Sequence, residues 1–551
     1  MRYLLLSLLL LSLSFGVGEG LYQKYCSSCH GEDRLGRGAP PLFPPFFIPK
    51  SEERIYEVIK KGTVGMPSFE HLKEDEIRAI VEFINRPVDE SKLRWSREDI
   101  EKSQSLFRVE KVRINNLKNL TVMVERGKGL LWVMEGSEVL SKVPISYVHG
   151  GVKFSKDGEV YIPSRSGWIS KYSPEKGEIK KVRACIYLRN IALSSDGKVL
   201  VASCWLPPSL VFFDKDLRLI QIKEVKGKIN AVYELRNGEG FIFTFRDRPY
   251  VGLLDKNEKI TYKSLDTTLE DFTIDPLEEY LIGSTREGLR IYSLKDLKLV
   301  KELKALGLPH LASSYFWYSK GEFYFATPLL GKPLLSVWKA YKWEHVKDIP
   351  LKGHGFLARS NYGTPYVWVD ESSDTLALLD KRSLELIRIR PAEGKRATHT
   401  EFSADGRLAY VSLEGALVVY DGVSLKKLKE YPASSPAGKY NFFNKSRIFE
   451  ASQLGYQVFM EKCWGCHHTT EQAFGPPLKW SAQKRDKALI MAQILDPKST
   501  YKLLGYSRNA MPRIENSVCV ALLPSAGLIL ISSKLLLSKR AKVSEDSSTH
   551  T

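Results

Sequence analysis

The sequence predicts an all-β eight-bladed propeller flanked by two small all-α domains. A β-rich unit, often with an Asp-Gly turn, recurs through the middle of the chain at about 35 to 45 residues, which is the blade spacing of a propeller. A Cys-x-x-Cys-His motif occurs at Cys26–His30 and again at Cys463–His467, outside these repeats. The chain has 551 residues, of which 43% are hydrophobic and 26% charged. This composition excludes a disordered, collagen-like or polytopic membrane protein.

The first 19 residues are predicted to be a signal peptide. Arg2 supplies a positive start, the apolar run from Leu4 to Phe15 follows, and small residues come next. This run is too short to span a bilayer comfortably. The cleavage site lacks an Ala-x-Ala pattern, so an uncleaved anchor is the alternative. In either case we expect the rest of the chain to be exported to the periplasm.

The two Cys-x-x-Cys-His motifs are typical of covalent heme c attachment. Two cysteines at this spacing reach the two vinyl groups of one porphyrin, and the adjacent histidine points at the iron. A disulfide or a zinc-type pair is the alternative for either copy, but two copies behind an export signal argue against it. The predicted residues are Cys26 and Cys29 with His30 for the first heme c, and Cys463 and Cys466 with His467 for the second.

A Met-Pro pair follows each motif and offers a sixth iron ligand. Met66 and Met511 are the candidates, because thioether sulfur is a soft ligand that raises the heme potential when it is paired with histidine. The alternative for each is a surface methionine. After Met66, apolar residues at 77, 80, 81 and 84 fall on one helical face. Residues 20–90 therefore resemble a class I cytochrome c domain, and residues 446–515 resemble a second, because Gly-Pro-Pro-Leu at 475–478 echoes Ala-Pro-Pro-Leu at 39–42.

Residues 109–445, after a linker at 91–108, carry the propeller pattern. Asp-Gly pairs suit tight hairpins, and alternating apolar residues suit half-buried strands. Eight such blades leave an axial channel that can hold a large flat ligand. The predicted blades are 117–143, 154–182, 193–222, 230–261, 272–300, 313–346, 365–390 and 402–430.

Residues 516–551 form an atypical apolar and basic tail. Pro524 and Gly527 would break a helix near the middle of its apolar part. A membrane-associating tail, a C-terminus altered by a reading-frame change and an ordinary buried segment are the three interpretations.

Four histidines lie in or beside predicted blade connections, where loops reach the axial channel. They are His149, His310, His354 and His399, each next to Gly, Pro or Thr. Neutral imidazole ligates iron, and near pH 6.5 it exchanges protons. The alternative is that each is a lone hydrogen-bonded histidine, although four at comparable positions favour a central site.

Four stretches of the propeller region resemble those of a known family. They begin at His149 (His-Gly-Gly-Val-Lys-Phe), Ala202 (Ala-Ser-Cys-Trp-Leu-Pro-Pro), His399 (His-Thr-Glu-Phe-Ser-Ala-Asp-Gly) and Pro436 (Pro-Ala-Gly-Lys-Tyr-Asn). The region is similar to the heme d1 propellers of cytochrome cd1 nitrite reductases and heme d1 biosynthesis proteins. The resemblance implies noncovalent binding of heme d1 or its precursor, with His149 as the proximal iron ligand. It places distal histidines at His310 and His354, and it suggests that Arg165 and Arg189 pair with the acidic side chains of heme d1. For these two arginines the alternative is a surface position.

Three functions remain open at this stage. The first is heme d1 biosynthesis of the dihydro-heme d1 dehydrogenase type, in which the propeller oxidises a precursor and passes electrons to heme c. His310, His354 or His399 would then act as the base. The second is nitrite reduction to nitric oxide, with electrons flowing the other way. The third is a non-enzymatic electron-transfer or heme d1 carrier protein. The second cytochrome c domain, which neither relative in the family shares, leaves the direction of electron flow undecided.

The chain has 82 Lys and Arg residues against 64 Asp and Glu residues, which gives a net charge of +18. Such a charge favours anionic ligands, acidic partners or membrane surfaces. The basic residues are scattered rather than clustered, so we expect a solvated basic surface and no nucleic-acid partner. The expected partners are electron-transfer cytochromes and heme d1 biosynthesis proteins. Membrane association through the signal or the tail, and oligomerisation, stay open.

Overall fold

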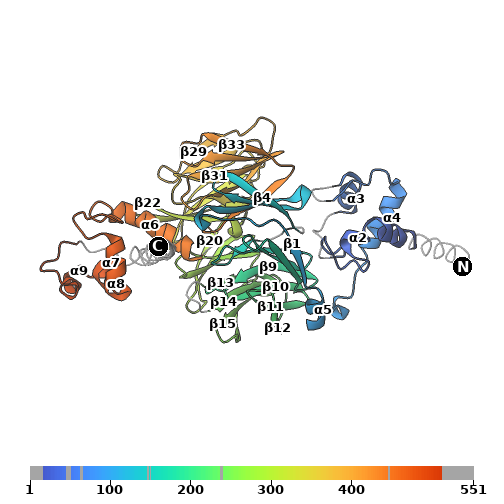
Figure 1. The fold of residues 1–551 in the computed structure, drawn as a ribbon, viewed down its shortest axis with the longest axis horizontal. Coiled ribbons are helices and arrows are strands. Elements are labelled where there is room, and N and C mark those ends of the chain that lie inside the picture. Colours follow the sequence, from blue (N-terminus) through green and yellow to red (C-terminus); the bar gives the residue numbers. More distant parts are fainter. Residues whose placement is uncertain are drawn as a thin grey trace, which may run out of the picture.

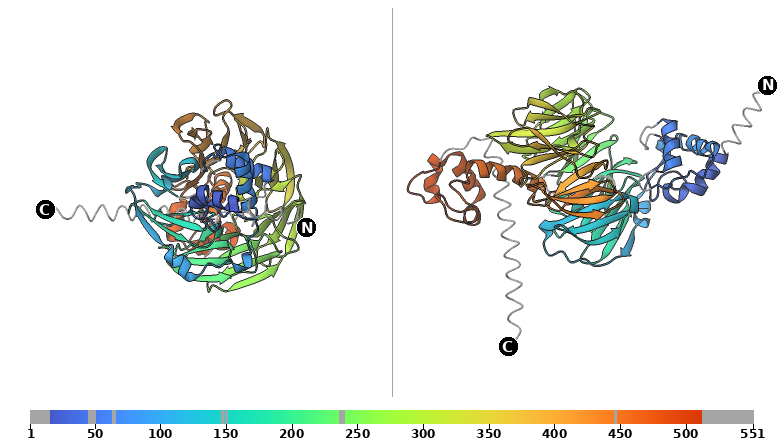
Figure 2. Two further views of the ribbon diagram at one scale, coloured as in Figure 1. Left: turned by 90° about the vertical axis from the view of Figure 1, so that its right-hand side faces the viewer. Right: turned by 90° about the horizontal axis from the view of Figure 1, so that it is seen from above.

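The computed structural model describes residues 16–44, 51–62, 66–145, 148, 151–235, 240–444 and 447–511. In this part of the chain a β-propeller lies between two helical units, which sit at opposite ends of the propeller axis (Figures 1 and 2). The predicted fold class is confirmed. Most of the signal peptide and the whole C-terminal tail predicted from the sequence lie outside the described residues.

The N-terminal helical unit contains α2 (Ser27–His30), α3 (Glu52–Lys61) and α4 (Glu74–Ile84). The side chain of Ser51 accepts a hydrogen bond from the N–H of Arg54 and so caps α3. Helix α4 buries Ile77, Ile80 and Val81, the face that the sequence predicts. These side chains pack with those of α3 and Tyr22 in one apolar core.

The segment expected to be a linker, residues 91–108, is ordered. It forms α5 (Arg97–Lys102) and β1 (Ser105–Arg108), and β1 pairs antiparallel with β8 (Glu178–Arg183) as an additional outer strand of a blade. Leu106 and Phe107 are 55% and 49% exposed. A short, exposed edge strand has no alternation of buried and polar residues, which is why its sequence resembles a linker.

The strands of the described residues form eight sheets. In chain order the first four are β2 (Leu120–Glu125), β3 (Leu130–Glu135) and β4 (Glu138–Pro144); β5 (Lys153–Phe154), β6 (Val160–Pro163), β7 (Trp168–Ser173) and β8; β9 (Tyr187–Leu193), β10 (Val199–Leu206), β11 (Pro208–Asp214) and β12 (Leu219–Glu224); and β13 (Ile229–Glu234), β14 (Gly240–Phe245), β15 (Tyr250–Asp255) and β16 (Ile260–Ser264).

The second half of the propeller repeats this arrangement. Its sheets are β17 (Asp271–Ile274), β18 (Tyr280–Thr285), β19 (Gly288–Ser293) and β20 (Leu299–Lys304); β21 (Leu308–Pro309), β22 (Tyr315–Ser319), β23 (Glu322–Leu330), β24 (Leu334–Lys339) and β25 (Glu344–Pro350); β26 (Ala358–Arg359), β27 (Tyr366–Asp370), β28 (Leu376–Asp380) and β29 (Leu386–Ile389); and β30 (Ala397–Phe402), β31 (Leu408–Leu413), β32 (Ala416–Asp421) and β33 (Lys427–Pro432).

The last strand of the propeller closes the ring. Strand β34 (Pro436–Asn441) pairs antiparallel with β2, so one sheet combines the two ends of the propeller sequence. The innermost strands contact one another around the axis: β30 contacts β34 and β26, and β9 contacts β5 and β13. Side chains on these strands therefore face the axial channel.

Asp-Gly turns join the first and second strands of three blades, as the sequence predicts. Gly158, Gly197 and Gly406 have φ angles of 83°, 77° and 72°. This left-handed backbone is easy for glycine and strained for a residue with a Cβ. The neighbouring aspartate closes the loop in the second case, where the Asp196 carboxylate accepts the N–H of Lys198 at 3.0 Å.

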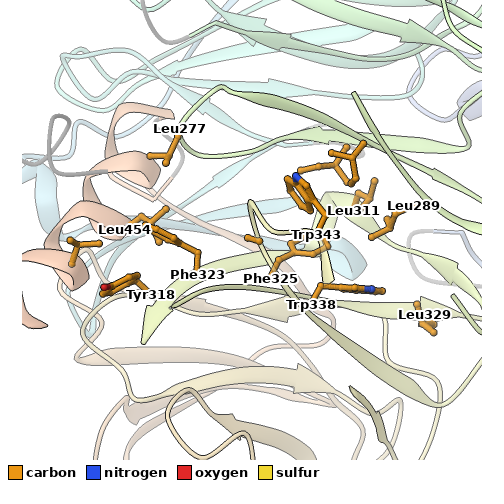
Figure 3. Close-up of a cluster of buried hydrophobic side chains, with 14 of the residues drawn as sticks. Leu277, Leu289, Leu311, Tyr318, Phe323, Phe325, Leu329, Trp338, Trp343 and Leu454 are labelled. Atoms are coloured by element: carbon orange, nitrogen blue, oxygen red, sulfur yellow. The ribbon is translucent and has the colours of Figure 1, made fainter. Parts of the chain in front are cut away.

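The C-terminal helical unit contains α6 (Arg447–Lys462), α7 (Leu478–Lys484), α8 (Lys487–Leu495) and α9 (Pro497–Thr500). Leu454, Val458 and Phe459 of α6 are buried against Tyr318 and Phe323 of the propeller (Figure 3). In addition, the carboxylate of Glu461 accepts the backbone N–H groups of residues 320 and 321. The motif at Cys463 follows α6 directly, so its position is set by the propeller. Within the described residues, no helix is long and apolar enough to cross a membrane.

Candidate functional site

The first Cys-x-x-Cys-His motif lies at α2 with its histidine oriented for a ligand. Nδ1 of His30 lies 2.8 Å from the carbonyl oxygen of Pro40. A carbonyl only accepts hydrogen bonds, so Nδ1 carries the proton and Nε2 keeps a lone pair for iron. Cys26 and Cys29 are free thiols, and the half-buried Met66 packs against the core of the same unit. These residues fit a heme c.

The second motif repeats this arrangement. Nδ1 of His467 lies 3.0 Å from the carbonyl oxygen of Pro476, so the echo of Pro-Pro between the two motifs corresponds to the same hydrogen bond. Gly475 makes room for this ring, because a Cβ there would lie 2.1 Å from its Cε1 atom. Cys463 is half-buried and Cys466 is exposed. The N–H of Met511 donates to the side chain of Asn509 at 3.1 Å, and its role as an iron ligand stays a prediction.

An axial pocket with a basic lining lies at one end of the propeller. It encloses about 610 Å³ of empty space, including the part open to solvent. No Asp or Glu is among its described lining residues, so it suits an anionic ligand. The lining consists of Val124, Arg126, Val148, Leu357, Arg359, His399, Thr400, Gly438, Lys439 and Tyr440.

The innermost strands position the titratable groups of this pocket. Lys439, on β34, is 4% exposed, and its Nζ donates to the hydroxyl of Ser412 and to the carbonyl of Ala437. Burial lowers the pKa of Lys439 to about 7. His399 lies at a bulge in β30 with a φ of 50°. Burial, followed by the charges of Lys439 and Arg126, lowers its pKa to about 3, so its imidazole is neutral at physiological pH.

His310 interrupts the innermost strand of its blade, between β21 and the 3-10 turn η4 (Leu311–Ser313). Its Nδ1 lies 2.7 Å from the carbonyl oxygen of Phe356 and 2.9 Å from Oγ of Ser313. The carbonyl requires Nδ1–H, which leaves Nε2 as a proton acceptor. Burial lowers the pKa of His310, while the carboxylates of Asp271 and Asp370 oppose this shift.

The other predicted site residues are distributed around the same end of the propeller. The Nε of Arg189 donates to the carbonyl of Asn230 at 2.8 Å, and the guanidinium of Arg165 lies 6.0 Å from the centre of the Tyr187 ring. His354 is exposed. Neither these three residues nor His310 are among the residues that line the pocket, although Leu357, next to the His310 partner Phe356, is. His149 lies outside the described residues, although the adjacent Val148 lines the pocket.

Sequence reasoning did not single out three cations of the pocket: Arg126, Arg359 and Lys439. A signal was present for Lys439, which lies within one of the stretches that resemble the family. Side chains of a strand point alternately to its two faces, and Lys439 stands at a position of the innermost strand β34 that faces the channel. Arg126 stands in the short connection between β2 and β3, and Arg359 ends the two-residue strand β26, so the relation of both to the axis depends on how the blades are arranged.

The N-terminal unit lies over the pocket end of the propeller. Arg183 donates from Nη2 to the carbonyl of Leu35 at 2.7 Å, and the Trp168 indole donates to the carbonyl of Arg37 at 2.6 Å. The ring of Phe43 is fully buried against Ile186 and other propeller side chains. These contacts lie at the end of the propeller where the outer strand of one blade connects to the innermost strand of the next. The pocket lies at the same end.

A disulfide joins Cys185 and Cys204 directly beneath this docking surface. In the structure they link β10 to the loop before β9. Ile186, next to Cys185, and Leu206, two residues after Cys204, lie in one apolar cluster with Phe43, so the bridge links two segments of the surface that receives the N-terminal unit.

Comparison with known proteins agrees with this organisation. Residues 115–445 match the family model for the cytochrome D1 heme domain, and residues 15–84 match that for cytochrome C oxidase, cbb3-type, subunit III. The chain is 34% identical over 469 residues to a dihydro-heme d1 dehydrogenase of Pseudomonas aeruginosa, covering 78% of this chain and 94% of that protein. It is 25% identical over 374 residues to protein NirF of Stutzerimonas stutzeri, covering 60% of this chain and 93% of NirF.

A solved structure is similar over the same extent. The structure of dihydro-heme d1 dehydrogenase NirN in complex with DHE matches with a TM-score of 0.72 and 34% identity, covering 78% of this chain and 99% of that one. The family model covers more than half of the sequence and coincides with the ring of blades that encloses the basic pocket. The chain therefore belongs to the cytochrome D1 heme domain family.

Proposed function

We propose that this protein acts in heme d1 biosynthesis, where it oxidises a dihydro-heme d1 precursor and passes the electrons to heme c. The observation that carries this proposal is the basic axial pocket with His399 in its wall, at the propeller end that the N-terminal unit covers. Its similarity to a dihydro-heme d1 dehydrogenase supports the choice of substrate.

The residues of both Cys-x-x-Cys-His motifs fit covalent heme c. Their histidines have Nδ1 hydrogen-bonded to a carbonyl, which leaves Nε2 for iron. Bound there, the hemes would supply one-electron acceptors. We propose two such groups, in domains at residues 20–90 and 446–515, with the propeller at 109–445.

In the pocket, the cations bind and orient the substrate. Arg126, Arg359 and Lys439 would pair with the carboxylates of the macrocycle, and guanidinium groups suit bidentate contacts of this kind. By the family resemblance, His149 would ligate the substrate iron. Converting a single carbon–carbon bond to a double bond releases two electrons and two protons, so the pocket also needs a proton acceptor.

Two histidines are the main candidates for this base. His399 lies in the pocket wall but is surrounded by cations, which disfavour its protonation in the empty site. His310 has its Nε2 fixed as an acceptor and is faced by two carboxylates. This arrangement favours His310 as the base, whereas a bound anionic macrocycle would be needed to raise the proton affinity of His399. His354, being exposed, is the weaker candidate.

The partners follow from this chemistry. Electrons must leave the chain, so we propose an electron-transfer cytochrome as acceptor and other heme d1 biosynthesis proteins as suppliers and recipients of the macrocycle. A periplasmic location is supported by the disulfide, since such bonds persist in oxidising compartments.

Nitrite reduction is the second candidate, because the same cations would also attract the nitrite anion. The experiment that separates the two supplies dihydro-heme d1 to the heme c-loaded protein without nitrite. We expect formation of heme d1 together with reduction of heme c in the same spectra. Replacing the histidine that acts as the base, whether His310 or His399, should slow conversion by about 10²-fold.

The matched control is His345→Ala, because His345 lies on the outer strand β25, is 45% exposed and pairs with Asp348. It should convert the substrate at the normal rate. If the heme d1-loaded, prereduced protein instead makes nitric oxide over many turnovers, and needs His310 and His354 but not His399, the biosynthetic function is wrong.

A further inference from the structure

Asp370 occupies an unusual position beside the candidate base. It ends strand β27 and is 3% exposed. One carboxylate oxygen accepts the backbone N–H of Phe356 at 2.6 Å and that of Leu357 at 2.9 Å. The backbone N–H of His399 also donates to this carboxylate. Asp370 therefore accepts hydrogen bonds from the backbone of two separate segments, one at Phe356 and Leu357 and the other at His399.

One peptide unit connects Asp370 to His310. The carbonyl of Phe356 and the N–H of Leu357 belong to the same planar peptide. The carbonyl accepts Nδ1–H of His310 at 2.7 Å, and the N–H donates to Asp370 at 2.9 Å. A negative charge at the N–H end polarises this peptide and makes its carbonyl a stronger acceptor, because hydrogen bonds in a chain reinforce one another.

We propose that Asp370 is a positioning residue that acts through the Phe356–Leu357 peptide to hold His310 as the Nδ1–H tautomer with a basic Nε2. The arrangement is a carboxylate–histidine pair with a peptide between its two members. It deepens the proposed function and rests on it for the role of His310 in turnover.

The buried charge argues for more than a structural role. A neutral Asn side chain offers the same acceptor oxygen for two backbone N–H groups, and keeping a buried carboxylate charged is costly. Burial raises the pKa of Asp370, while its backbone hydrogen bonds and the charge of Arg396 oppose this. The other charged groups that face His310 are Asp271 from β17, which favours the imidazolium, and Arg359 from β26, which disfavours it.

The test compares Asp370→Asn with a control from the neighbouring strand. Asp380, at the end of β28, likewise accepts two backbone N–H groups, from Arg382 and Ser383 at 2.8 and 2.7 Å, but at the other end of the blade. The readout is the pH dependence of His310 modification by diethyl pyrocarbonate, followed by mass spectrometry of the heme c-loaded protein without substrate. The pH midpoint of His310 modification should fall by about one unit in Asp370→Asn, which is the order expected when one nearby negative charge is removed. It should be unchanged in Asp380→Asn.

An unchanged midpoint in folded Asp370→Asn, or an equal shift in Asp380→Asn, would overturn the proposal. If Asp370→Asn does not fold, long-range ¹H–¹⁵N spectra of the reduced wild-type protein report the tautomer directly, with His310→Gln to assign the resonance. A proton on Nε2 would refute the proposal. Both readouts are independent of turnover, so a wild-type protein that fails to convert dihydro-heme d1 would refute the proposed function alone. In turnover, Asp370→Asn should lower kcat with little change in KM.

Discussion

Arg183 of the propeller holds Leu35 of the N-terminal unit by a hydrogen bond of 2.7 Å from Nη2 to the backbone carbonyl. The same guanidinium donates to the carbonyl of Ser166 at 3.0 Å and lies 4.6 Å from the centre of the Trp95 ring. Leu35 lies between His30 and Pro40, in the loop that orients the His30 ring. One buried side chain thus connects the first Cys-x-x-Cys-His motif to the propeller.

Arg183→Ala should weaken this docking. Both carbonyls lose a charged donor, and a hydrogen bond to a charged group contributes about 1.5 to 3 kcal/mol. We expect faster limited proteolysis within residues 87–96, between the two units. Arg108→Ala is the control, because Arg108 forms an exposed ion pair with Glu178 on the same blade. Equal proteolysis of the two variants would assign the docking to the apolar contacts alone.

Two covalent hemes per chain are expected from the two matching motifs. Mass spectrometry of the mature protein should show two heme additions. Cys463→Ala should remove one and leave the other, because the N-terminal unit and α6 lie at opposite ends of the propeller (Figure 1). A single addition in the wild-type protein would mean that the C-terminal unit does not bind heme c.

His149→Ala should abolish retention of the noncovalent macrocycle while both heme c spectra stay intact. The physical reason is the preference of heme iron for imidazole. Absorption spectra before and after acid–acetone extraction check this, since only the noncovalent group is extracted. Normal affinity in the variant would remove His149 from the ligand set.

Lys439 should make binding of an anionic macrocycle pH-dependent. Burial lowers the pKa of Lys439 to about 7, and a bound carboxylate would raise it. The complex then holds a proton that the free protein loses above pH 7, so affinity should fall as pH rises from about 7 to 9, by at most tenfold per unit. Equilibrium titrations should show this slope in the wild type and not in Lys439→Met. A slope that persists in the variant would assign the effect to another group.

The Cys185–Cys204 bridge should stabilise the propeller by about 3 kcal/mol, the scale for a closed loop of this length. Denaturant unfolding of the Cys185→Ser, Cys204→Ser double variant should show this loss. The wild-type protein in excess reductant should unfold at the same midpoint as the variant. If the reduced wild type keeps its original midpoint, the bridge contributes nothing to stability.

The blade repeat and the Cys-x-x-Cys-His motifs could be read from the sequence because they are local. Asp157-Gly158 and Asp405-Gly406 are neighbours in the chain, and the turns that they form depend on the backbone freedom of Gly and on local hydrogen bonds such as that from the N–H of Arg407 to Asp405. The helical face of α4 follows from a period of 3.6 residues. Such features need no knowledge of distant contacts.

The wall of the pocket could be predicted only in part. Arg126 and Lys439 are 313 residues apart in sequence numbering (439 − 126) and meet because β34 pairs with β2. No local pattern encodes this pairing. The tautomer of His310 likewise depends on a carbonyl from the next blade, at Phe356. Histidines beside Gly and Pro indicate the axial end of the propeller, but their partners are set by the closure of the ring.

That closure also orders events as the chain is made. The blade of β2, β3 and β4 lacks its innermost strand until β34, at residues 436–441, has been synthesised. The N-terminal unit has its own apolar core, so it can fold while the ring is still open. The C-terminal unit follows β34 immediately, and its long helix α6 packs on the propeller. With heme c bound at both motifs as proposed, attachment at the first can precede assembly of the pocket, whereas the second motif is positioned only once α6 packs on the completed ring.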